Sequence, residues 1–365
     1  MTRTLGWLRV NSINNLSLDS GALKLRCKLL LIACICITPV ASLANGDTTV
    51  RQATQELVRN GNLDKAMDIL NKSEVEHPNF RLATFMRAEL LTALTGGAIA
   101  NKSKSEVRDG EAPQNLLSEL QLRNSVIPNL TDLRPAQVLK MPKNADVILV
   151  DASLSRAYLL RNKDGDPVWE KDYYVTIGKL GVGKQKEGDL KSPLGVYSVT
   201  MQIPKQQLRS IFGAGALELS FPNALDKKLD ISGSGIWLHG VPKDTYSRAP
   251  KASDGCLAFA NDDVREIIEL ASKRQINVTV VPSVQWLKKA DWSARATKVS
   301  NEIAAYRSEG LKKKIVRPPE AIYATESTST LVIDQPIGQG EGSAVYREYW
   351  DKNGNGWNLK FKSRT

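Results

Sequence analysis

The chain has 365 residues, a formal net charge of +11 at pH 7, four cysteines and two histidines. At roughly 100–200 residues per domain, this length predicts two or three domains. Hydrophobic residues make up 42% and charged residues 24%, a balance that excludes collagen-like, largely disordered and multi-span membrane proteins, while the few cysteines exclude a small disulfide-stapled protein.

The first segment, residues 1–44, is predicted to be a secretory signal peptide. Basic residues precede a short apolar run at 29–37, and Ser42 and Ala44 occupy the small-residue positions of a signal peptidase site, so cleavage is expected after Ala44. The run is too short to span a bilayer, which needs about 20 residues. The lead-in is long, which leaves the true start codon open, and lipidation at Cys34 stays open as well. We expect a periplasmic protein with no stable membrane span after cleavage.

Removal of this segment changes the charge and the cysteine count. It leaves 45 Lys and Arg against 38 Asp and Glu, a net charge of +7, and Cys256 becomes the single cysteine. A lone cysteine cannot form an internal disulfide. Cys256 is therefore a reactive thiol, a partner in an intermolecular disulfide, or an inert buried residue.

Residues 47–97 are predicted to form a small helical module, because apolar residues recur there every three or four positions. A glycine, an alanine, a leucine and a proline between positions 61 and 78 have a spacing that resembles the second half of a tetratricopeptide repeat. Only one copy is visible, so the segment is either a module that binds a protein partner or a plain structural helix pair. His77, next to Pro78, is expected to be exposed and inert.

Residues 98–143 are polar, contain prolines and are predicted to be a linker region with a short helix near 116–122. Residues 144–282 are predicted to form a mostly β domain. Its expected strands are 147–150, 157–160, 172–177, 195–201, 235–239 and 276–281. One helix is predicted at 262–273, with Asn261 as its N-cap and acidic residues in its first turn.

Residues 283–365 are predicted to form an α+β extension, which makes the whole chain a multi-domain α+β protein. A helix is expected at 284–306, followed by a basic connector and strands at 343–351 and 357–362 around a turn. The last hairpin resembles that of NTF2-like domains. Four of the seven tryptophans lie in this extension; they either pack in a small core or stack on sugar rings.

Cys256 and His239 carry the chemistry that the sequence predicts. Cys256 follows Ser253 and Gly255 just before the predicted helix, and His239 with Gly240 ends a predicted strand seventeen residues upstream. A thiol attacks acyl groups as the thiolate, and an adjacent imidazole can take its proton and return it to a leaving amine. Glycine before the cysteine permits a tight turn whose amide N–H groups can face a developing oxyanion.

This arrangement, His-Gly followed by Ser-x-Gly-Cys-Leu, resembles the active-site signature of the YkuD-type L,D-transpeptidases. Upstream, Ser-Pro-Leu-Gly-Val-Tyr at 192–197 is similar to another element of that family, and the order and spacing of the elements are kept. The resemblance covers about residues 145–282. It implies a mostly β catalytic domain of a Gram-negative-type envelope enzyme that acts on peptidoglycan, with roles in cell-wall organisation and cell shape.

The resemblance also implies a mechanism. Cys256 would attack the amide between the third and fourth residues of a peptidoglycan stem peptide, D-alanine would leave, and an amine acceptor would resolve the acyl-enzyme to give a 3–3 cross-link. His239 would be the base, and the carbonyl of Gly240 would orient its imidazole. Ser253 would shape the site, and Gly255 with Cys256 would supply oxyanion N–H groups. No metal or organic cofactor is implied.

Several alternatives stay open. Many members of the family have Arg two residues after the cysteine, where this chain has Ala258, so hydrolysis by an L,D-carboxypeptidase or amidase is the nearest alternative. A non-catalytic wall-binding scaffold is another. A zinc site would need three or four ligands, with Asp244 or Asp254 joining the cysteine and histidine. The basic surplus suits an anionic wall polymer, and no nucleic-acid partner is expected.

A second motif, at 178–185, nearly fits the phosphate-binding loop Gly-x4-Gly-Lys-Ser/Thr. Gln185 replaces the hydroxyl that would hold Mg²⁺, and Gly188 and Pro193 prevent a helix from starting after the loop. We therefore interpret this segment as an ordinary loop.

Overall fold

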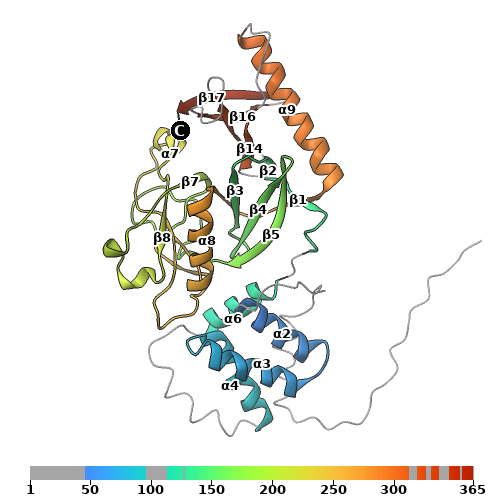
Figure 1. Cartoon of the computed structure of the whole chain (residues 1–365), viewed down its shortest axis with the longest axis vertical. Helices are drawn as coiled ribbons and strands as arrows, with labels where there is room; N and C mark the ends of the chain where they lie inside the picture. The colour runs from blue at the N-terminus through green and yellow to red at the C-terminus, as the bar shows by residue number, and fades with distance from the viewer. Residues whose placement is uncertain are drawn as a thin grey trace, which may run out of the picture.

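The computed structural model describes residues 46–95, 113–125, 128–311, 319–325, 330–336, 345–353 and 356–364. The predicted signal peptide with Cys34, and the basic connector at 312–318, lie outside these residues. Figure 1 shows three parts along the long axis: helices at one end, a sheet-rich domain in the middle, and strands with a long helix at the other end. None of the helices in the described stretches has the length and hydropathy to traverse a bilayer.

The helical part contains α2 (Gly46–Val58), α3 (Leu63–Glu76), α4 (Arg81–Leu94) and α6 (Pro113–Arg123). The side chain of Asn62 accepts from the Lys65 N–H and caps α3. The helices share one apolar core, formed by Val50, Leu70, Phe80, Leu90, Leu120 and their neighbours. Helix α6 lies in the segment expected to be a linker, but Leu120 is almost completely buried in this core. The helical part described by the structure therefore reaches Arg123.

The middle part is built on an eight-stranded sheet with the order β11-β9-β8-β7-β12-β3-β4-β5. Its strands are β3 (Ala145–Asp151), β4 (Arg156–Lys163), β5 (Asp166–Tyr174), β7 (Gly195–Gln202), β8 (Ala216–Leu219), β9 (Trp237–His239), β11 (Leu257–Ala258) and β12 (Gln275–Val281). The central strands β3 and β12 pair in parallel. Every residue of β3 is buried, because structure covers both faces of the sheet at its centre.

Helix α8 (Asn261–Lys273) packs Val264 and Ile267 into the main core beside this sheet (Figure 1). The expected N-cap was wrong, because Ala260 occupies that position and has no side-chain cap. The Asn261 amide has other partners instead: its Oδ1 accepts from the Ala214 N–H at 2.8 Å, and its Nδ2 donates to the Val241 carbonyl at 2.9 Å. Asn261 thus joins two loops next to His239.

Short elements complete the middle part. Strands β6 (Ile177–Gly178) and β10 (Lys251–Ser253) pair in parallel, and β1 (Leu133–Pro135) pairs with β13 (Trp286–Lys288). Helix α7 (Ala224–Lys228) and the 3-10 turns η1 (Lys205–Gln207) and η2 (Ser210–Phe212) lie in the connections.

The C-terminal part combines α9 (Lys289–Leu311) with a five-stranded sheet ordered β17-β16-β15-β14-β2. Its strands are β2 (Val138–Lys140), β14 (Ala321–Thr325), β15 (Thr330–Pro336), β16 (Val345–Asn353) and β17 (Gly356–Arg364). Helix α9 starts later than expected because β13 takes the preceding residues. Trp292, Trp350 and Trp357 are buried, which favours packing over sugar stacking for these three. The NTF2-like resemblance stays a prediction.

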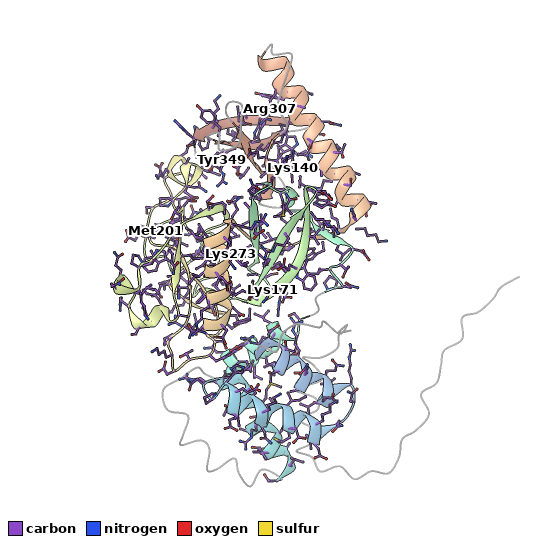
Figure 2. All side chains as sticks on the ribbon, viewed as in Figure 1. Lys140, Lys171, Met201, Lys273, Arg307 and Tyr349 are labelled. Atoms are coloured by element: carbon purple, nitrogen blue, oxygen red, sulfur yellow. The ribbon has the colours of Figure 1, made fainter. Side chains whose placement is uncertain are left out.

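The middle and C-terminal parts share a core. Leu149 and Tyr158 of the eight-stranded sheet pack in one cluster with Tyr323 and Tyr349, the last of which is labelled in Figure 2. Arg347 adds polar contacts, since it pairs with Asp334 at 2.7 Å and donates to the Val196 carbonyl of β7. The two parts are therefore held as one body.

Candidate active site

Cys256 lies on a sharp turn between β10 and β11. The preceding Gly255 has φ +132°, and a Cβ atom there would come within 2.8 Å of the Lys191 carbonyl oxygen, so only glycine fits. The thiol is unpaired and half-buried. Its Sγ lies 3.5 Å from the Trp237 backbone nitrogen, which donates to it, and 3.4 Å from the Gly235 carbonyl oxygen.

The buried Ser253 hydroxyl closes this turn from inside. It accepts from the Gly255 N–H at 3.1 Å and donates to the Cys256 carbonyl at 2.6 Å. The Gly255 N–H therefore already has a partner in this state, and it could face an oxyanion only by exchanging that hydrogen bond. The Trp237 N–H, which the sequence did not single out, is the donor that approaches the sulfur.

Ser192 supports the same turn from the other side. Its side chain is fully buried, and its Oγ accepts from the Gly178 N–H at 3.0 Å and donates to the Gly255 carbonyl at 2.8 Å. Sequence reasoning quoted Ser192 only as part of a motif and gave it no role. The pairing spans 63 residues, and a small polar residue before a proline was the only local signal.

His239 ends β9 and is 4% exposed. Its Nδ1 lies 2.6 Å from the Gly240 carbonyl oxygen. Because a carbonyl oxygen only accepts, Nδ1 carries the ring proton and Nε2 keeps its lone pair. Gly240 itself lies tightly against its surroundings, since a Cβ there would come within 2.9 Å of the Ala214 nitrogen.

Strand pairing brings the thiol and the imidazole to one place. β11 pairs with β9 in parallel, with Leu257 opposite Leu238 and Ala258 opposite His239. One residue earlier, this register sets Cys256 beside Trp237, two residues before the histidine on the neighbouring strand, in agreement with the contact between Sγ and the Trp237 nitrogen. The Phe212 ring packs on both Trp237 and His239, with centroid distances of 4.9 and 5.0 Å.

Burial favours the neutral form of both groups. It lowers the pKa of His239 to about 4, an effect that the charge of Arg248 reinforces and the Gly240 carbonyl opposes. Burial also raises the pKa of the Cys256 thiol, with a further contribution from Asp254, while the Trp237 N–H acts in the opposite direction. At neutral pH the resting pair is therefore a thiol beside a neutral imidazole, which is able to take up a proton.

The other predicted sites take simple structural roles. Lys184 lies in the segment that nearly fits a phosphate-binding loop; it is buried and pairs with Asp189 at 2.9 Å. No helix follows this segment, so the interpretation of residues 178–185 as an ordinary loop is confirmed. Within the described ranges, no three His, Cys, Asp or Glu side chains converge as metal ligands. Asp254, one of the extra zinc ligands considered, pairs with Lys179.

The helical part docks on the loop between His239 and Cys256. Tyr246 of this loop accepts a hydrogen bond from the Gly46 N–H at 2.6 Å, and its ring packs on Phe80 and His77 at centroid distances of 4.4 and 4.8 Å. The expectation of an exposed His77 was therefore wrong: the ring is half-buried because Tyr246 covers it.

Buried charges reinforce this contact. Asp47 of α2 pairs with Arg156 of β4 at 3.1 Å and with Arg123 of α6 at 3.0 Å, and both arginines are almost fully buried. Arg156 also pairs with Asp172, and the Arg123 guanidinium lies over the Tyr174 ring. The helical part is thus fixed against β4 and β5 as well as against the loop.

Comparison with known proteins gives a family for the middle part. Residues 145–282 match the YkuD family, the L,D-transpeptidase catalytic domain. YafK of Escherichia coli, whose name proposes it as an L,D-transpeptidase, is 30% identical over 126 residues, which are 34% of this chain and 46% of the relative. The chain thus matches about half the length of its curated relatives.

Two solved structures also match the chain. Bd1075 of Bdellovibrio bacteriovorus aligns with a TM-score of 0.51 and 21% identity, over 64% of this chain and 98% of the other, which is a likeness of fold. The helical cell shape determining protein Pgp2 of Campylobacter jejuni aligns with a TM-score of 0.38 and 17% identity, over 68% and 92% of the two chains.

Proposed function

Residues 145–282 are a domain of the YkuD L,D-transpeptidase family, and from this we propose that the protein is an envelope peptidoglycan L,D-transpeptidase that uses Cys256 as its nucleophile. The substrate class is the stem peptide of peptidoglycan, and the site is periplasmic. The observation that carries the proposal is the arrangement of His239: its Nδ1–H is held by the Gly240 carbonyl, so Nε2 is free to take the thiol proton.

In the first step, the proton of the Cys256 thiol passes to Nε2 of His239 while Sγ attacks the carbonyl carbon of the third stem residue. The C–N bond to D-alanine then breaks, and Nε2 returns the proton to the departing amine. A thioester on Cys256 remains. The Trp237 N–H, 3.5 Å from Sγ, stabilises the developing thiolate in this step.

In the second step, the amine of a second stem attacks the thioester carbonyl and gives its proton to Nε2. The C–S bond breaks, the peptide bond of a 3–3 cross-link forms, and the thiolate recovers the proton from the imidazole. Because both groups rest in their neutral forms, each step moves one proton between sulfur and nitrogen and leaves no net charge buried.

The test is a product assay on the mature protein with disaccharide-tetrapeptides. We expect free D-alanine, 3–3 cross-linked dimers, and a thioester on Cys256 detectable by mass spectrometry; Cys256→Ala should abolish all three. Release of tripeptide monomers without dimers would assign the same thioester to hydrolysis, as in an L,D-carboxypeptidase or amidase. An intact substrate with wild-type protein would instead favour a wall-binding scaffold.

A further inference from the structure

A cleft of about 450 Å³ opens between the helical part and the nucleophile turn. Its walls come from four regions of the chain: the start of α4, the turn after β6, the short helix η2, and the segment between His239 and Cys256 that contains β10. The lining residues are Arg81, Lys179, Ile211, Thr245, Ser247, Arg248, Ala252 and Asp254. Asp254 lies two residues before Cys256, so the cleft lies next to the turn that carries the nucleophile, although Cys256 itself is not among the lining residues.

The charge of this cleft is unbalanced. Three cations, Arg81, Lys179 and Arg248, line it together with the single carboxylate of Asp254. Lys179 and Asp254 pair with each other at 2.9 Å. Neither the Arg81 nor the Arg248 guanidinium has a hydrogen-bond or ion-pair partner among the residues that the structure describes. Two arginines therefore face the cleft with their hydrogen-bonding capacity unused, which favours an anionic ligand.

Arg81 belongs to the helical part, but its position beside the cleft is fixed. Asn79, two residues earlier, donates through Nδ2 to the Lys243 carbonyl at 3.0 Å and accepts through its backbone carbonyl from the Tyr246 N–H at 3.3 Å. The Arg81 N–H in turn donates to the Asn79 carbonyl at 3.1 Å. These bonds hold the first turn of α4 against the loop that carries Arg248.

Arg248 lies on the catalytic side of the cleft. Its backbone carbonyl accepts from Tyr174 Oη at 3.0 Å and from Thr176 Oγ1 at 3.2 Å, so the sheet fixes its main chain. Arg248 belongs to the segment that leads from His239 to the nucleophile turn, and its charge contributes to the lowered pKa of His239, the group that handles the proton of the reacting amine. An anion bound by Arg248 would therefore lie next to that amine.

In the proposed reaction, both the departing and the incoming amine have an anionic group beside them. The departing D-alanine carries its carboxylate on the carbon next to the reacting amine, and so does an incoming amino acid centre such as that of a diaminopimelate side chain. We propose that Arg81 and Arg248 together bind the carboxylate adjacent to the reacting amine, so that the helical part completes the substrate site. This inference rests on the proposed function and makes Arg81 and Arg248 determinants of specificity.

The experiment compares two donors that differ only in this charge: a disaccharide-tetrapeptide ending in D-alanine, and the same compound ending in D-alanine amide. Wild-type protein should release D-alanine with a kcat/KM about tenfold to hundredfold above that for D-alanine amide, since bonds to a charged group contribute on this scale. Arg81→Gln and Arg248→Gln should each reduce this ratio about tenfold or bring it near one. Arg87→Gln, on the same helix but paired with Asn71 and Glu74, should keep the wild-type ratio.

A binding measurement on a variant that cannot react tests carboxylate recognition independently of catalysis. Calorimetry on Cys256→Ala protein should give tighter binding of the free carboxylate than of the amide, and Arg81→Gln in that background should remove the difference. Equal affinity for both compounds in Cys256→Ala, or an unchanged kcat/KM ratio in Arg81→Gln, would overturn the inference. Absence of any product with wild-type protein would refute the proposed transpeptidase, while the binding result would still decide the role of the arginines.

Discussion

Ser192→Ala is expected to loosen the nucleophile turn without touching the nucleophile. The serine hydroxyl is fully buried and satisfies two main-chain groups, the Gly178 N–H at 3.0 Å and the Gly255 carbonyl at 2.8 Å. Alanine keeps the packing of the Cβ atom but leaves both groups buried and unpaired. Each such group costs about 1–3 kcal/mol, so the loss of two partners should lower the free energy of unfolding by about 2–6 kcal/mol.

Urea denaturation measures this loss, and the mature wild-type protein is the reference. The same variant should lower kcat/KM by roughly tenfold or more, because the released carbonyl belongs to the residue before Cys256 and small misplacements of a reacting group are costly. Ser272→Ala is the matched control: its exposed hydroxyl donates to the Glu269 carbonyl, and its loss should change stability by less than about 0.5 kcal/mol. If Ser192→Ala were as stable as Ser272→Ala, the argument from buried partners would be refuted.

Three further predictions concern the site and its support. His239 must be neutral to accept a proton and its pKa is about 4, so kcat/KM should rise with pH around that value and then level off. Arg248→Gln removes a cation that lowers this pKa, so the rise in the pH–rate profile should move to higher pH. An unshifted profile would contradict an effect of Arg248 on His239. Gly240→Ala should lower kcat/KM about tenfold to hundredfold, because its Cβ would displace the carbonyl that orients the imidazole; normal turnover would argue against that role. Asp47→Asn should lower the free energy of unfolding by about 3 kcal/mol at neutral pH, since it removes the charge shared by the buried arginines of β4 and α6. Surrounding arginines hold the pKa of Asp47 well below its usual range, so the difference from wild type should shrink as the pH falls below about 4. A pH-independent difference in urea denaturation would contradict a stabilising role of the Asp47 charge.

Cys256 and His239 could be proposed from the sequence as the candidate pair because their signal is local. Cys256 and His239 each lie in a short motif beside a glycine. Gly255 permits the turn before Cys256, and Gly240 follows the strand that ends at His239. Most strands of the middle part were also expected, since their apolar runs are long enough to show a period. The N-cap at Asn261 was wrong because a side chain that caps helices well can also join two loops, and tertiary contacts decided between these uses.

The contacts that position the pair could not be predicted in this way. Ser192 meets Gly255 across 63 residues, and Tyr246 meets Gly46 across 200. No periodicity links residues so far apart, because such contacts depend on how finished elements pack. His77 illustrates the limit: beside a proline at a helix end it has the pattern of an exposed residue, and only the docked loop covers it.

Strand β2 has a consequence for how the chain folds. It precedes the catalytic domain, yet it pairs with β14 on the far side, with Lys140 opposite Ile322, 182 residues later. Closing a loop of that length in an unfolded chain is entropically costly. The parallel pairing of β3 and β12, with Ala145 opposite Gln275, brings the two flanking segments together once the catalytic domain has formed. We expect this to shorten the effective loop about fourfold, a gain of about 1 kcal/mol, so the catalytic domain should fold first and act as the template on which the last sheet assembles.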